Sequence, residues 1–171
     1  VILTGGGVVC TYNIQNFNVC WRPHMREYTH VTGALLLYVS LAFLINLNVT
    51  IIGIFFAGWI SLFPDIMDRL FGEHRGIGHS IFWVIPFILI GFFNYLLAFS
   101  LIIGFTSHLF FDIFTTHGCP ILYPFIKTSF VSLSMRNRIK TGTNIEKAVF
   151  IFILILLIPT LLFTTGHFFI W

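Results

Sequence analysis

Three long runs of apolar residues constrain the fold of this chain more than any other feature. They cover residues 31–63, 81–105 and 148–170. The chain is 57% hydrophobic and only 9% charged, with a mean hydropathy of +0.95. A soluble domain of 171 residues cannot bury so much apolar surface. The sequence therefore predicts an integral membrane protein whose residues 25–171 form one membrane domain.

Asparagines interrupt the first two runs. At 1.5 Å per residue, one helix over 31–63 would be about 50 Å long, against a hydrocarbon core of about 30 Å. Asn46 and Asn48 divide this run into a hairpin of two helices, each on the short side for a full span. Asn94 divides the second run in the same way. The third run adds a C-terminal span with a kink at Pro159. The expected fold is all-α, a polytopic helical bundle with about five transmembrane helices in two short hairpins plus this span.

Two polar connections separate these runs, over residues 64–80 and 121–147. The second ends in a helix start, with Thr143 or Asn144 as cap and Glu146 in the first turn. Five spans place both connections and the N-terminus on one side. That side holds every Lys and Arg: Arg22, Arg26, Arg69, Arg75, Lys127, Arg136, Arg138, Lys140 and Lys147. The positive-inside rule makes it the cytoplasmic side of the membrane, so the net charge of +3 indicates topology and not nucleic-acid binding.

Residues 1–24 contain neither a span nor a signal peptide. They precede Met25, after which the sequence reads like the start of a membrane protein, so we interpret them as a non-essential N-terminal extension. Cys10 and Cys20 lie in it, and with Cys119 they show no CxxC spacing. Neither a disulfide framework nor a thiolate metal site is expected.

The stretch HLFFDIFTTHGC (108–119) carries a polar face at the end of the second run. His108, Asp112 and Thr115 share one helical face, at i, i+4 and i+7. Such groups cost several kcal/mol in hydrocarbon unless they meet partners or a metal ion. One interpretation is a buried His–Asp hydrogen bond that locks two helices together. The other is a metal site, which gains support because further polar clusters end apolar segments in the same way.

Those clusters lie at the same end of the predicted bundle. Asp65 and Asp68 are spaced i, i+3, and His74 and His79 flank a glycine-containing tight loop. The first hairpin brings His30 level with Asp65. The predicted metal ligands are His30, Asp65, Asp68, His74, His79, His108 and Asp112.

Imidazole and carboxylate ligands suit Zn²⁺, with Mn²⁺ or Fe²⁺ as alternatives, and seven are enough for one or two ions. Metal-activated water could then hydrolyse a phosphoester. Arg75 could bind a phosphate oxygen, and Asp65 or Asp68, whichever is not a ligand, could act as general base.

The same residues resemble the YdjM-like family of membrane-bound proteins described as metal-dependent hydrolases. The resemblance covers about residues 28–150. It rests on THVTG (29–33), SLFPDIMDR (61–69), HRGIGHS (74–80), GFTSHLFFDIFTTHG (104–118) and TGTNIE (141–146). It implies an inner-membrane helical bundle with a metal site built from these motifs. The pattern also looks distantly like that of zinc-dependent phospholipases, by analogy alone.

A site at the lipid–water boundary favours a lipid or another amphiphilic substrate, whose acyl chains can stay in the bilayer. Two other classes remain open. A small transporter or ion-binding protein would use the same charges as a permeation path, although no charge lies mid-span. A structural or regulatory membrane protein would keep the site for rigidity.

Overall fold

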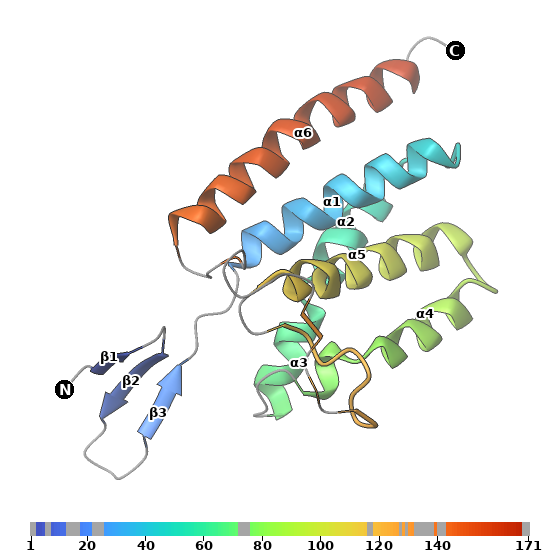
Figure 1. Ribbon diagram of the computed structural model, residues 1–171. Coiled ribbons are helices and arrows are strands. Elements are labelled where there is room, and N and C mark those ends of the chain that lie inside the picture. The colour runs from blue at the N-terminus through green and yellow to red at the C-terminus, as the bar shows by residue number, and fades with distance from the viewer. Residues whose placement is uncertain are drawn as a thin grey trace.

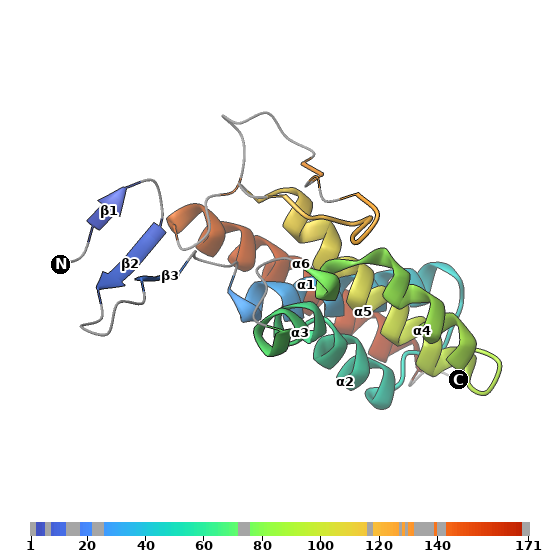
Figure 2. The ribbon, with the colours of Figure 1, turned by 90° about the horizontal axis from the view of Figure 1, so that it is seen from below.

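The computed structural model describes residues 3–5, 8–12, 18–21, 26–71, 76–115, 118–126, 128, 130–131, 139 and 143–168. Its N-terminal part is a three-stranded antiparallel sheet in the order β1-β2-β3, formed by β1 (Leu3–Gly5), β2 (Val8–Tyr12) and β3 (Asn18–Trp21). The sheet lies beside the helices in both views (Figures 1 and 2). The N-terminal stretch therefore has strands of its own, which the apolar runs do not predict.

The membrane part is helical, which confirms the predicted all-α bundle. Its elements are α1 (Glu27–Leu44), α2 (Ile51–Ile60), α3 (Phe63–Phe71), the 3-10 turns η1 (Ile77–His79) and η2 (Ile81–Trp83), α4 (Val84–Ile90), α5 (Tyr95–Ile113) and α6 (Asn144–Phe168). Within the described residues, four helical segments are long and apolar enough to cross a membrane: Glu27–Leu44, Ile51–Phe71, Tyr95–Ile113 and Asn144–Thr164. A fifth segment, Ile81–Ile90, is apolar but shorter.

Helix α5 is the centre of the bundle. It packs against α1, α2 and α4, while α6 packs along the other side of α1 (Figures 1 and 2). Phe105 of α5 is fully buried, and the core around it includes Ile60 of α2 and Phe87 of α4. Because α5 touches the most neighbours, a polar side chain on its inner face meets residues from several other elements.

The two predicted hairpins turn at the predicted asparagines. Asn46 has a φ of 54°, in the left-handed region that asparagine tolerates better than most residues. Thr50 then caps α2 by accepting a hydrogen bond from the Gly53 N–H. Asn94 caps α5 by accepting one from the Leu97 N–H, 3.0 Å away. These side chains start new helices by satisfying exposed N–H groups.

The connection predicted over residues 64–80 is partly helical, which corrects the hairpin boundaries. After a turn at Ser61 and Leu62 the chain continues as α3 to Phe71. Pro64 lies in the first turn of α3, where its missing N–H removes no intrahelical bond. The second arm of the hairpin is therefore longer than predicted. Helix α6 begins at Asn144 with Glu146 in its first turn, as predicted, and contains Pro159.

Two glycines offer a matched test of the packing around α5. A Cβ on Gly104 would overlap the Ala57 carbonyl and the Ile60 side chain of α2. A Cβ on Gly58 would meet Val31 at 3.5 Å, an ordinary contact. We expect Gly104→Ala to lower the free energy of unfolding by about 1–3 kcal/mol. Gly58→Ala should be neutral or stabilising, by up to about 1 kcal/mol. Unfolding of both variants in mixed micelles would measure this, and equal values would contradict the close α2–α5 approach.

Candidate metal centre

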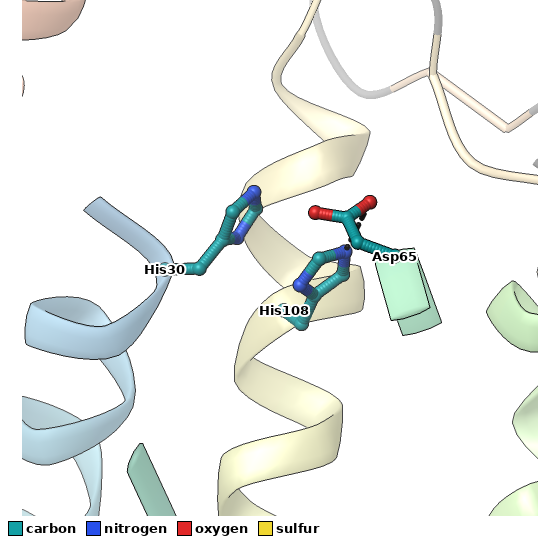
Figure 3. Close-up of side chains that lie close together, drawn as sticks. All are labelled: His30, Asp65 and His108. Atoms are coloured by element: carbon teal, nitrogen blue, oxygen red, sulfur yellow. Dashed lines mark ion pairs between the residues drawn. The ribbon is translucent and has the colours of Figure 1, made fainter. Parts of the chain in front are cut away.

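Six of the seven predicted ligands come together at one end of the bundle. Helix α1 contributes one, α3 two, η1 one and α5 two: His30, Asp65, Asp68, His79, His108 and Asp112. None of the six is more than 6% exposed. Figure 3 shows His30, Asp65 and His108 reaching toward a common point from three helices. The predicted ligand His74 and the predicted phosphate-binding Arg75 lie outside the described residues.

Four potential ligand atoms surround the centre of the cluster. The Nε2 atoms of His79 and His108 are 3.2 Å apart. Oδ2 of Asp112 lies 3.2 Å from the first and 3.9 Å from the second. Oδ1 of Asp65 lies 3.9 and 3.8 Å from the same two atoms. A tetrahedral ion with bonds of about 2.0–2.1 Å keeps its ligands about 3.3–3.4 Å apart. The separations among His79, His108 and Asp112 are therefore close to those of one such ion, and Asp65 lies just beyond them.

Both histidines turn their other ring nitrogen away from this centre. Nδ1 of His108 is 2.6 Å from the carbonyl oxygen of Ser61, at the turn between α2 and α3. A carbonyl can only accept, so Nδ1–H donates and the Nε2 lone pair faces inward. Nδ1 of His79 lies 2.9 Å from Oδ2 of Asp68. A hydrogen bond such as that of His108 to Ser61 fixes the tautomer and the ring orientation of a metal-binding histidine, and for His79 the Asp68 carboxylate lies at ion-pair distance on the outer side.

Asp68 is engaged with the loop before His79. Its carboxylate accepts hydrogen bonds from the N–H groups of Gly76 and Gly78, at 3.1–3.2 Å. The approach is close enough that a Cβ on Gly78 would lie 2.5 Å from the Pro64 carbonyl oxygen and 2.7 Å from Oδ1 of Asp68. Glycine at position 78 is thus what allows η1 to close onto α3. Asp68 holds this loop and His79 together, while Asp65 faces the centre.

His30 and Asp112 extend the cluster on its α1 side. The His30 ring stacks on the His108 ring, with centroids 3.9 Å apart and an interplanar angle of 18°. Its Nε2 lies 3.7 Å from Oδ1 of Asp112. Asp112 therefore faces His79 with one oxygen and His30 with the other. Two overlapping groups have metal-site spacing within the described residues: His79, His108 and Asp112, and His30, Asp65 and His108.

The buried carboxylates control the charge of His79. Burial lowers its pKa, but hydrogen bonds and charge from Asp112 and Asp68 outweigh that effect and raise the pKa to about 9. In the absence of a metal the imidazole is therefore protonated at neutral pH. The same carboxylates that stabilise this proton would stabilise a metal cation in its place.

Three residues have roles that sequence patterns do not reveal. Ser61 acts through its carbonyl, which any residue could supply. Thr115 shares the predicted face of α5, but its hydroxyl donates to the Asp112 carbonyl of its own helix. Glu146 is fully buried and accepts a hydrogen bond from the Arg26 N–H at the start of α1, so it ties α6 to the helix that carries His30. The sequence marks it only as part of the first turn of the last helix and of the TGTNIE motif, with no role attached. Thr116 and His117 lie outside the described residues.

Comparisons with known proteins identify a family but not a close relative. A family model described as YdjM inner membrane protein matches residues 25–168. No curated protein and no solved structure matches the chain significantly. The matched range begins after the N-terminal sheet and includes every residue of the buried His–Asp cluster.

Proposed function

The chain belongs to the YdjM family of inner membrane proteins, and from this premise we propose that it is a membrane-bound, metal-dependent hydrolase. One observation carries the proposal: three imidazoles and three carboxylates are buried together, with the Nε2 atoms of His79 and His108 both directed at the centre. Burying so many carboxylates is costly unless a cation neutralises them. A bound divalent ion would supply that charge.

The geometry supports a specific assignment of ligands. His79, His108, Asp65 and Asp112 would hold one ion, and His30 with Asp112 would contribute to a second. Mixed nitrogen and oxygen ligands favour Zn²⁺, with Mn²⁺ or Fe²⁺ as alternatives. Asp68 would orient His79 from outside. This role follows from its contacts with His79 and with the backbone of the loop.

The bound ion would lower the pKa of a water molecule and stabilise negative charge on a phosphoryl oxygen. The protein's own residues would supply the general base, exclude bulk water and bind the phosphate. With Asp65 among the proposed ligands, Asp68 is left as the candidate general base, and its oxygens also accept hydrogen bonds from backbone N–H groups. Burial of the cluster would exclude bulk water. Arg75 keeps its predicted role at a phosphate oxygen.

An amphiphilic phosphoester is the substrate that fits the position of the site. His30 lies near the start of α1, and His108 and Asp112 near the end of α5, so the cluster sits toward one end of the spans. A headgroup could reach it while the acyl chains stay between the helices. The excess of Lys and Arg on that side would attract anionic headgroups and supports a site that faces the cytoplasm.

The test of the proposal combines metal content with turnover. Protein purified without chelator should hold at least about 0.5 divalent ion per chain. The metal-loaded protein should hydrolyse a member of a panel of phospholipids and lipid-linked phosphates, and His79→Ala should lose this activity. Full metal loading with no turnover, together with protein-dependent ion flux across liposomes, would favour a transporter instead.

Topology gives a separate prediction about the side of the site. Asn46 lies in the turn of the first hairpin, and Thr128 is exposed in the connection before α6. In a background with Cys10 and Cys20 replaced by serine, we expect Asn46→Cys to react with an impermeant maleimide in spheroplasts. Thr128→Cys should react only after permeabilisation. Reaction of both from outside would contradict the cytoplasmic placement of the site.

A further inference from the structure

An apolar groove lies between α1 and α5. Its lining includes Ser107, the residue before His108 of the candidate metal centre. Its volume is about 230 Å³. Leucines of α1 line one wall, and a face of α5 with i, i+3, i+4 and i+7 spacing lines the other: Leu37, Leu41, Ile103, Thr106, Ser107 and Phe110. Both helices are long and apolar enough to cross a membrane. What touches this groove from outside is therefore the acyl region of the bilayer.

One polar group in the groove lacks the partner that its surroundings would normally provide. The Ser107 side chain is 1% exposed, and its Oγ has no hydrogen-bond partner among the described residues. Its neighbour Thr106 donates to the Ile102 carbonyl, and Ser100 on the same helix donates to that of Leu97. A buried hydroxyl without a partner is unfavourable, because it loses the hydrogen bonds that water would give it. This cost makes Ser107 a candidate to donate to a ligand in the groove.

The groove lies at the right depth for an acyl chain and is long enough for part of one. From Ile103 to Phe110 it follows α5 for about 10 Å, within the roughly 15 Å depth of one leaflet. Ser107 precedes His108 directly, about 1.5 Å along the helix axis. A lipid whose phosphate reached the cluster would place its ester carbonyl, a few bonds away, near the level of Ser107.

We propose that the α1–α5 groove seats an acyl chain of a diacyl phospholipid, with the Ser107 hydroxyl donating to the ester carbonyl of that chain. The proposal names the substrate class for the hydrolase site and rests on that proposed function for the position of the phosphate. It excludes lipids without an acyl ester as preferred ligands. In the groove between α1 and α6, the Thr160 and Thr164 hydroxyls instead donate to carbonyls of α6.

Binding of defined lipids would test the ester contact. The full chain in micelles is titrated, without metal and after Zn²⁺ loading, with a diacyl phosphatidylglycerol and with its dialkyl ether analogue, and binding is measured by native mass spectrometry. We expect Ser107→Ala to weaken binding of the diacyl lipid about threefold to tenfold. The ether lipid should bind equally to both proteins. Ser100→Ala is the matched control, because its hydroxyl already has a partner within α5.

Photolabelling would locate the acyl chain of the bound lipid. A diacyl probe with a diazirine in one acyl chain should label peptides from both walls of the groove. Leu37→Trp should fill the groove and reduce this labelling, whereas Leu44→Trp, in the α1–α6 groove, should not. Labelling spread evenly over all helices, equal loss of both lipids in Ser107→Ala, or a dimer that shields the groove would each overturn the proposal. If the lipid binds as predicted but is never hydrolysed, the result would support the acyl-chain groove and contradict only the proposed hydrolase activity.

Discussion

Asp112→Asn is expected to weaken metal binding by at least about 100-fold, more than any other single change in the cluster. Asp112 takes part in both proposed ion positions, with one oxygen facing each. Its Oδ2 lies 3.2 Å from Nε2 of His79, and its Oδ1 lies 3.7 Å from Nε2 of His30. The amide keeps the shape of the carboxylate but removes its charge. Both candidate ion positions therefore lose a ligand at once.

The measurement is competition for Zn²⁺ against a chromophoric chelator, with metal content after dialysis as a second readout. The variant should stay folded, because losing one of three buried carboxylates also relieves repulsion between them. Its unfolding transition in micelles checks this. Phe110→Leu, two residues away on the outward side of α5, is the control and should bind metal like the wild type. A wild-type affinity in Asp112→Asn would show that the cluster is a proton-linked network and not a metal site.

The order of the elements could be predicted from sequence because its signals are local. Asn46 and Asn94 lie inside apolar runs too long for one helix, so each had to mark a turn. Helix α3 was wrongly predicted as part of a connection because its charges resemble those of a loop. In the structure α3 is amphipathic, with its carboxylates facing the bundle interior and apolar side chains facing outward, where lipid would lie. Asp65 and Asp68 point inward, whereas Leu70 and Phe71 are 74% and 59% exposed.

The membership of the cluster could also be predicted, but not the roles within it. Spacing along α5 places His108 and Asp112 on one face, and the hairpin brings His30 near them. What distinguishes Asp65 from Asp68 is the backbone that each one meets. Asp68 accepts from two N–H groups in a glycine-containing loop, and backbone partners leave no mark in a residue pattern. Tertiary contacts alone separate an inward-facing carboxylate from one that orients a histidine.

Asp68→Asn is the second large effect, and it separates orientation from ligation. Asparagine keeps one acceptor oxygen but loses the negative charge that faces His79 Nδ1, 2.9 Å away. The imidazole would then be held less firmly in the tautomer that turns its Nε2 lone pair inward. We expect metal affinity to fall about 10-fold to 100-fold, the usual effect of removing an outer-shell partner. The number of ions bound at saturation should not change.

Substitution of Co²⁺ for the native ion gives the decisive readout, because its visible spectrum reports the number and type of ligands. If Asp68 only orients His79, saturated Asp68→Asn should show the wild-type Co²⁺ spectrum, and Asp65→Asn should not. Asp68→Glu should restore little affinity, since the longer side chain cannot fit the space that Gly78 leaves against α3. A changed spectrum in Asp68→Asn would make Asp68 a ligand itself. The loop from Gly76 to His79 would then close onto α3 through the metal, and not through hydrogen bonds alone.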